Sequence, residues 1–228
     1  MRPTGRALRA GGADRGETIP QRILRDAQFA DARCRLASQY GETLGRIQQV
    51  PLARLPALAD EHPLQRYRRM LTESGHLHPA LEVAFRWLEA NRPGPGDQVL
   101  VHGDFRNGNG IVGPDGLRAV IDWELAHLGD PMEDLGWFCL RAFRFGHALP
   151  VGGFGEYREL IQAYRSVTGR TVDAETLRWW MVLGTVRWGL VCVLRTVQHL
   201  SGIARSLELA AIGRRVCEAE YDLLLLLP

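Results

Sequence analysis

Apolar side chains recur at helical spacing along most of this chain. Between residues 32 and 49, Leu36, Tyr40, Leu44 and Ile47 fall on one face of a helix. A shorter helix is expected after Pro20, because proline suits the first turn of a helix. The same periodicity predicts helices over residues 64–74, 79–91, 131–145, 155–168, 173–200 and 204–226. The pattern therefore predicts a mainly helical protein.

The segment 173–200 is the most apolar of these predicted helices. Its apolar positions are Trp179, Trp180, Leu183, Val186, Leu190 and Leu194. They form a broad face that we expect to be buried. Arg187 interrupts the run, and no uncharged stretch reaches the roughly 18–20 residues that a bilayer span requires. We therefore expect a core helix and no membrane partner.

The middle of the chain has a different character. The breaker sequence at 92–97 (RPGPGD) precedes a short apolar strand at 99–101, and two more strands are expected at 111–112 and 117–121. Gly113-Pro114-Asp115-Gly116 joins the last two, and this composition is typical of a tight turn. A lone hairpin is unstable in water, so this one must lie on the helices. The predicted fold class is mainly α with a small β-hairpin.

Composition and charge exclude several classes of protein. The 228 residues carry a net charge of +2, which gives no reason to expect a nucleic-acid partner. The four cysteines are far apart and lack metal-ligand spacing, which favours a reducing cytoplasm. All basic residues are arginine, and there is no lysine. Residues 1–16 are rich in Gly and Arg and are expected to be a disordered tail and linker, with one lobe over 17–228.

Candidate chemistry surrounds the hairpin. Its turn sets Val112 opposite Leu117, which places Asn109 nearly opposite Val120. Asp122 is then about two residues away, or roughly 7 Å, so its carboxylate and the Asn109 amide can converge on one cation. Hard oxygen donors of this kind suit Mg²⁺.

Asp104 lies on the loop that leads into the same hairpin, five residues before Asn109. If it is not itself a metal ligand, it is free to accept a proton from an attacking hydroxyl. One acid–base aspartate with one asparagine and one aspartate on the metal is the division of labour of phosphoryl transfer.

The motif H-x-D-x4-N, followed by a hairpin and an aspartate, resembles the catalytic and metal-binding loops of kinases. Gly103 after the histidine, and Trp123-Glu124 after the aspartate, make it similar to the aminoglycoside phosphotransferase and choline-kinase-like family. The continuation at 124–137 (ELAHLGDPMEDLGW) is also similar to kinase-like domains fused to some acyl-CoA dehydrogenases. The resemblance covers residues 16–226 and implies a protein-kinase-like C-terminal lobe.

The resemblance implies a role for each motif residue. Asp104 would be the catalytic aspartate, and Asn109 and Asp122 would hold Mg²⁺. The supporting residues would be His102, Glu124, Asp130 and Asp134. Purely structural roles are the leading interpretation for His102 and Asp134, which would hydrogen-bond the loop, and for Asp130, which would cap the helix after Pro131. Glu124 would support the site or face the substrate.

The function implied is ATP-dependent, Mg²⁺-assisted phosphorylation of a small-molecule hydroxyl. The acceptor stays open. Such kinases also have a β-rich N-terminal lobe with a lysine for the nucleotide phosphates. Here the first hundred residues are mostly helical in pattern and no lysine exists, so the N-lobe is expected to be largely absent. We expect the chain to be weakly active or inactive alone.

Three explanations compete for this missing lobe, and we favour the first. They are a truncated product, a partner chain that supplies the lobe, and a non-catalytic pseudokinase-type binding module. A metal-dependent phosphohydrolase is a weaker alternative, because it would need more clustered ligands. Gly110 departs from the expected pattern, since a large apolar residue should open this strand, and a glycine there predicts looser placement of Asn109.

Overall fold

The protein's structure, a computed structural model, describes residues 16–58, 61–94 and 96–228. The tail expected at 1–16 therefore lies outside the described residues, except for Gly16. The α-helices are α1 Pro20–Arg25, α2 Ala30–Gln48, α3 Pro63–Ser74, α4 Pro79–Ala90, α5 Met132–Phe138, α6 Tyr157–Thr168, α7 Ala174–Leu200, α8 Leu207–Gly213 and α9 Val216–Leu226. The strands are β1 Val99–Val101, β2 Gly110–Gly113, β3 Gly116–Val120 and β4 His127–Gly129.

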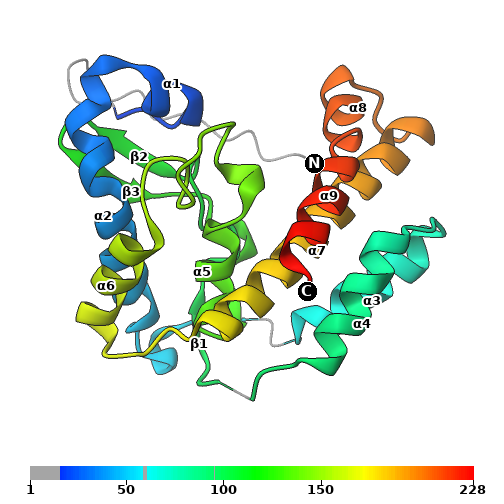
Figure 1. Ribbon diagram of the computed structural model, residues 1–228, viewed down its shortest axis with the longest axis horizontal. Coiled ribbons are helices and arrows are strands. Elements are labelled where there is room, and N and C mark those ends of the chain that lie inside the picture. The colour runs from blue at the N-terminus through cyan, green and yellow to red at the C-terminus, as the bar shows by residue number, and fades with distance from the viewer. Residues whose placement is uncertain (1–15, 59–60, 95) are drawn as a thin grey trace.

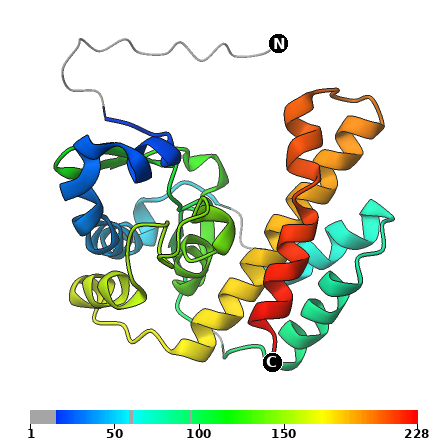
Figure 2. The same ribbon diagram turned by 45° about the horizontal axis from the view of Figure 1, so that its top comes forward.

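The fold has two groups of elements, with the central helix α5 between them (Figures 1 and 2). One group contains α2, α6 and the β2–β3 hairpin, and α2 packs on both α6 and β3. The other contains α3, α4, α8 and α9, all of which pack on α7. Helix α5 also packs on α7. The long helix α7 therefore contacts the central helix as well as the second group. The mainly helical prediction is confirmed.

Helix α7 is buried as its apolar face predicted. Trp179, Trp180, Leu183, Val186 and Leu190 are all buried, and Leu194 is half-buried. By length and composition α7 could cross a membrane, but core helices of globular proteins pass the same test, and 61% of its most apolar window is buried within this fold. Its hydrophobicity is accounted for by packing.

Two small antiparallel sheets lie in the centre of the chain. The β2–β3 hairpin was expected, and its turn pairs Gly113 with Gly116. The other sheet pairs β1 with β4, with Val101 opposite His127. Strand β4 was missed by the sequence reading, because three residues are too few to show an alternating pattern. Glu17 adds a short bridge to Val112, with backbone hydrogen bonds of 2.8 and 2.9 Å.

Two predicted helices are each interrupted, and both predictions were wrong in this respect. The segment 131–145 begins as α5 but leaves the helix at Leu140, whose backbone is extended (φ −62°, ψ 141°) before a 3-10 turn at Arg141–Phe143. This change of direction lets both Leu140 and Phe143 reach the core. The segment 204–226 divides into α8 and α9, and α9 packs against α4 as well as α7.

Candidate functional site

The hairpin brings Asn109 next to the segment that carries Asp122. Val112 lies opposite Leu117, as the sequence predicted. A β-bulge then shifts the register by one residue, and the Ile121 N–H donates to the Asn109 carbonyl at 2.9 Å. The expectation that Asn109 faces Val120 was therefore off by one position, because Arg118 is the extra residue of the bulge. The shift brings Asp122 one residue closer to Asn109.

Asp122 lies two residues after the end of β3 and has an unusual backbone conformation. Its φ of 70° and ψ of 59° are in the left-handed region, which is uncommon for a residue other than glycine. The chain then turns into the 3-10 segment Trp123–Leu125. The Asp122 carboxylate is exposed and makes no hydrogen bond or ion pair within the described ranges. A strained, unpaired acid of this kind is a candidate for function.

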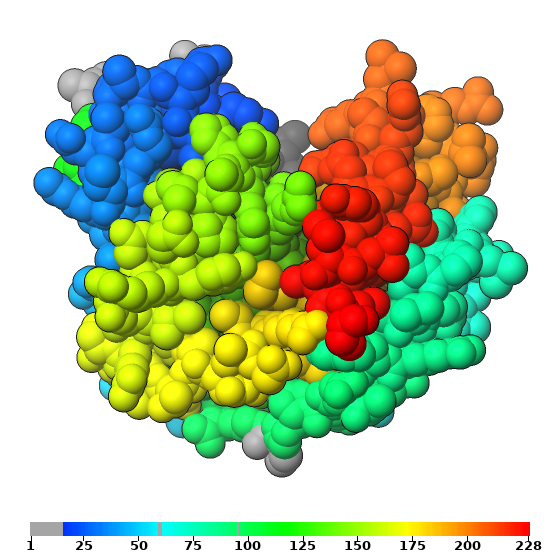
Figure 3. Space-filling model, viewed as in Figure 1, coloured from blue at the N-terminus to red at the C-terminus, as the bar shows by residue number. Residues whose placement is uncertain are grey.

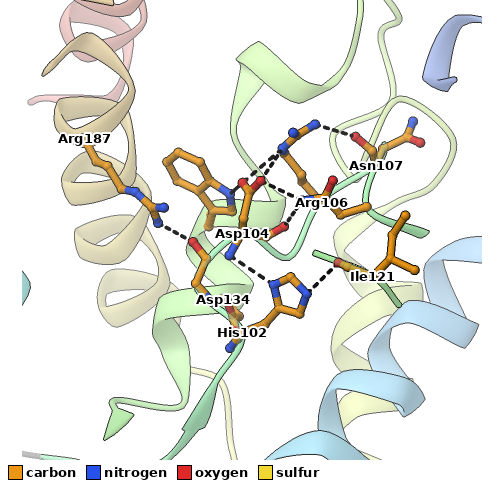
Figure 4. Close-up of polar contacts among 10 residues, drawn as sticks. His102, Asp104, Arg106, Asn107, Ile121, Asp134 and Arg187 are labelled. Carbon is orange, nitrogen blue, oxygen red and sulfur yellow. Dashed lines mark hydrogen bonds and ion pairs between the residues drawn. The ribbon is translucent and has the colours of Figure 1, made fainter. Parts of the chain in front are cut away.

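Asp104 has the most hydrogen-bonded carboxylate of the site. Its Oδ1 accepts from Trp137 Nε1 at 2.8 Å, and its Oδ2 accepts from Asn109 Nδ2 at 2.6 Å. Arg106 Nε lies 3.0 and 3.1 Å from the two oxygens (Figure 4). Three side chains therefore fix the orientation of the carboxylate, and Asn109 Nδ2 also donates to the Asp104 carbonyl at 2.9 Å.

His102 joins the two acid-bearing segments. Its Nδ1 accepts the Asp104 N–H at 3.1 Å, so Nε2 carries the proton and donates to the Ile121 carbonyl at 3.0 Å (Figure 4). Burial lowers the pKa of His102 and so favours this neutral form. The imidazole thus holds the loop of Asp104 against the strand end that precedes Asp122.

Asp134, on α5, holds the start of the catalytic loop. Its two oxygens accept the backbone N–H groups of His102 at 2.7 Å and Gly103 at 3.0 Å, and the side chain is fully buried. Burial raises the pKa of Asp134 to about 7. Gly103 has a φ of 83°, and a Cβ there would meet the Leu125 carbonyl. Only glycine fits this turn without strain.

Phe105 anchors the loop from the other side. It is fully buried and packs edge-on against Tyr40 of α2 and Phe138 of α5, with centroid distances of 5.5 Å in both cases. Phe154 completes the cluster at 5.7 Å from Tyr40. Asp104 therefore projects from a backbone that is fixed on both sides, by hydrogen bonds and by aromatic packing.

The remaining predicted residues lie farther from Asp104. Asp130 Oδ1 accepts the Met132 N–H at 2.8 Å, which is the helix-capping contact that the sequence suggested. Burial raises the pKa of Asp130. Glu124 is exposed on the 3-10 turn and makes no hydrogen bond within the described part of the chain.

The donor set of Asn109 and Asp122 fits a hard divalent cation. The Asn109 amide nitrogen is committed to Asp104, which leaves its Oδ1 without a hydrogen bond among the described residues. The Asp122 carboxylate is also unpaired. An amide oxygen and a carboxylate are ligands that Mg²⁺ accepts when waters and phosphate oxygens complete its shell.

Comparison with known proteins decides which family this geometry represents. Residues 12–170, more than half of the chain, match the family model described as "Phosphotransferase enzyme family". The chain belongs to this family.

Solved structures of the family share the fold at low sequence identity. A protein from Ralstonia eutropha JMP134, described as an aminoglycoside phosphotransferase, superposes with a TM-score of 0.70 at 20% identity. The match covers 98% of this chain and 70% of that one. A choline/ethanolamine kinase family protein from Mesorhizobium loti gives 0.62 at 14% identity, over 93% and 67%. The AMP-bound spectinomycin phosphotransferase APH(9)-Ia gives 0.55 at 19% identity, over 81% and 65%. The expected kinase-like fold is confirmed.

Curated relatives match over shorter stretches. Mouse acyl-CoA dehydrogenase family member 10 is 41% identical over 75 residues, which are 32% of this chain and 7% of that protein. Chicken acyl-CoA dehydrogenase family member 11 is 30% identical over 133 residues, which are 51% of this chain and 17% of that protein. The chain therefore spans only a small part of the curated relatives that it matches.

Three site residues of this phosphotransferase-family chain were missed or misjudged by sequence reasoning. Arg106 was one of the unassigned positions of the H-x-D-x4-N motif, but it pairs with Asp104. Trp137 was noted only as part of a motif, and Arg187 only as an interruption of an apolar run. An arginine inside a buried helix was a usable signal, because a buried charge needs a partner.

Proposed function

We propose that this chain is the catalytic lobe of a kinase that transfers the γ-phosphoryl group of ATP to a hydroxyl of a small molecule. The observation that carries the proposal is the set of contacts around Asp104. Asn109 donates to the Asp104 carboxylate, and its carbonyl accepts the N–H of Ile121, the residue before Asp122. These contacts set Asn109 beside Asp104 and beside the residue that precedes Asp122, which supports the arrangement that phosphoryl transfer requires.

Asp104 is proposed as the residue that orients the acceptor and takes its proton. The acceptor oxygen forms a bond to the γ-phosphorus, the bond from that phosphorus to the β–γ bridging oxygen breaks, and ADP leaves. The hydroxyl proton passes to the Asp104 carboxylate. The three donors that fix this carboxylate, Arg106, Asn109 and Trp137, set its direction in advance.

Mg²⁺ is the proposed metal, held by Asn109 Oδ1 and Asp122. It would neutralise charge on the phosphate oxygens. Two structures with the same fold are nucleotide complexes, the AMP-bound spectinomycin phosphotransferase and the GDP complex of aminoglycoside 2'-phosphotransferase-IIIa. These complexes support a nucleoside triphosphate as the phosphoryl donor here.

The nucleotide site is proposed to be completed from outside the described residues. The strands described in this chain form two two-stranded sheets only, and the sequence has no lysine to contact the nucleotide phosphates. Arginine is a poor substitute, because its planar fork has another reach and geometry. A partner chain or a further segment that carries a β-rich lobe would supply both the cover and the cation.

The acceptor is proposed to enter the cleft between the loop after α5 and the helix α9. This cavity of about 730 Å³ is lined by residues that include Arg141, Arg144, Arg215, Glu218 and Asp222, and Asp104 is not among its lining residues. Figure 3 shows the hollow between the two halves of the molecule. Both carboxylates are already paired, Glu218 with Arg215 at 2.9 Å and Asp222 with Arg141 at 3.5 Å. An acceptor without several positive charges fits this lining better than a polyamine.

Two other functions are less well supported. A phosphohydrolase with a metal cluster would need several grouped ligands, and the described residues contain no group of three or more His, Cys, Asp or Glu side chains that could hold a metal ion. A non-catalytic binding module would not need the Asp104 carboxylate to be fixed by three donors. It remains the alternative that the experiment must separate from a kinase.

The decisive experiment measures phosphoryl transfer from labelled ATP with Mg²⁺ to a panel of neutral, anionic and cationic alcohols. The chain is assayed alone and with the β-rich lobe of a family member added as a second chain. Transfer that requires the added lobe and is lost in Asp104→Ala is the expected result. Asp115→Ala is the control, because Asp115 is exposed in the hairpin turn and pairs only with Arg118 among the described residues. Nucleotide binding without transfer under all of these conditions would favour the binding module.

A further inference from the structure

Trp137 is a buried donor to Asp104 that comes from a remote helix, α5. Its indole Nε1–H donates to Asp104 Oδ1 at 2.8 Å, and the side chain is 4% exposed. An indole is a donor only, so the direction of this bond is fixed. Arg106, in contrast, has a long side chain that is 28% exposed. Trp137 therefore ties the orientation of Asp104 to α5.

Arg187 braces this tryptophan from α7. Its guanidinium lies 4.0 Å from the centre of the Trp137 ring, within the range of a cation–π interaction. Its Nη1 also donates to the Gly103 carbonyl at 2.5 Å, and Figure 4 shows the side chain reaching from its helix towards the loop of Asp104. Phe143 contacts the same indole at a centroid distance of 4.8 Å. Arg187 thus touches both the indole and the residue before Asp104.

We propose that Trp137 is a positioning residue for Asp104 and that Arg187 is its brace. The role of Asp104 as proton acceptor rests on the function proposed above, whereas the dependence of its orientation on Trp137 does not. A carboxylate that must meet an acceptor hydroxyl in one geometry benefits from a donor whose own position is fixed by packing. Arg187 is given this role because it joins α7 both to the Trp137 ring and to the Gly103 carbonyl, which precedes Asp104.

The test removes the indole N–H and keeps the ring. Trp137→Phe still offers an aromatic ring to Arg187 and Phe143 but cannot donate to Asp104. Trp188→Phe is the matched control, because Trp188 packs on the same Phe143 at 5.8 Å and its buried Nε1 has no hydrogen-bond partner within the described ranges. Each variant loses one indole N–H. Of the two, only the Trp137 N–H makes a hydrogen bond to a described residue.

The readout is the side-chain amide of Asn109 in nuclear magnetic resonance spectra of the 228-residue chain, which needs no turnover. Asn109 Nδ2 donates to Asp104 Oδ2, so a change of carboxylate orientation alters its signals. We expect a clear shift in Trp137→Phe and none in Trp188→Phe. No shift in Trp137→Phe, or equal shifts in both variants, would overturn the proposal.

A reciprocal measurement covers the case in which Trp137→Phe does not fold. In Asp104→Ala the acceptor is removed and both tryptophans stay. Hydrogen exchange of the Trp137 indole N–H should then become about tenfold faster, as expected for a lost bond to a charged acceptor, and that of Trp188 should not change. Unchanged exchange at Trp137 contradicts the proposal. The phosphoryl-transfer assay decides the proposed function separately, because neither spectroscopic result depends on catalysis.

Discussion

The hydroxyl of Tyr40 occupies the space that a side chain at position 110 would fill. A Cβ on Gly110 would clash with this oxygen and would lie 2.9 Å from the ring carbon that bears it. The sequence analysis expected a large apolar residue at position 110, and Tyr40 from α2 fills the space that such a side chain would occupy. The Tyr40 hydroxyl is buried and has no hydrogen-bond partner in the described part of the chain.

Replacement of Tyr40 by Phe should therefore not destabilise the protein. The change removes a buried, unpaired hydroxyl, and the free energy of unfolding should stay the same or rise by about 1 kcal/mol. Tyr164→Phe is the matched control, because the Tyr164 hydroxyl is also buried but donates to Gln48 Oε1 at 2.6 Å. That variant should lose about 1 kcal/mol. Urea unfolding of both variants checks the contrast, and equal losses would contradict it.

Gly110→Ala should destabilise the chain by about 1–3 kcal/mol, the usual cost of an added group in a packed interior. Combination with Tyr40→Phe should restore part of this loss, because the hydroxyl is the atom most crowded by the new Cβ. A double-mutant cycle measured by chemical unfolding reports this coupling. Strict additivity of the two changes would show that Tyr40 and Gly110 do not share the space.

Asp122 should be needed for tight binding of a divalent cation beside Asn109. Mn²⁺ is a paramagnetic substitute for Mg²⁺, and its binding to the chain can be followed by line broadening. Asp122→Asn should weaken binding by at least the ~10-fold that loss of an outer-shell partner costs at other metal sites. Asp115→Asn, in the exposed hairpin turn, should leave the affinity unchanged. Equal affinity in all three proteins would exclude Asp122 as a metal ligand.

The 228-residue chain alone should show little or no turnover with ATP and Mg²⁺. A single well-placed cation on the transferring phosphate contributes about 10³–10⁵-fold to kcat in related chemistry, and this chain has no lysine to provide it. Release of ADP, with Asp104→Ala as the blank, is the measurement. Fast turnover that disappears in Asp104→Ala would mean that an arginine of this chain performs the task.

Stability should depend on pH through Asp134. Burial raises its pKa to about 7, above the ordinary value of 3.8, so the folded state binds its proton more tightly than the unfolded chain. Its contribution to stability is thus complete below about pH 4 and is lost as the pH rises towards 7. Asp134→Asn cannot titrate, so the stability advantage of the wild type over this variant should shrink between pH 4 and pH 7. A gap that widens over this interval, measured by urea unfolding, would contradict the assignment.

Local patterns made the hairpin and its neighbours predictable. The turn at Gly113–Gly116 fixes its own register, so the pairing of Val112 with Leu117 followed from sequence alone. The bulge at Arg118 did not, because a bulge depends on how β3 packs against α2 and leaves no sign in a five-residue strand. The motif residues were found for the same local reason, since Asp104, Asn109 and Asp122 all lie within one short stretch of chain.

Contacts between distant segments could not be read in this way. Trp137 reaches Asp104 across 33 positions, and Arg187 reaches Gly103 across 84. Neither residue is part of the spacing of the catalytic motif. The sequence therefore gave no sign that Trp137 or Arg187 lies near Asp104. Their positions depend on how α5 and α7 pack against each other. Local sequence preferences do not determine this packing, because it depends on side chains from distant parts of the chain.

The sequence by itself therefore determined the helical periodicity, the hairpin and the identity of the acid and amide groups, because these depend on neighbours in the chain. The tertiary structure decided how Asp104 is held, why Gly110 fits beside Asn109, and which half-buried arginine braces the loop. The physical reason is the range of the interactions involved. Backbone preferences act over a few residues, whereas the hydrogen bonds and ring contacts that orient a carboxylate exist only once remote helices have packed together.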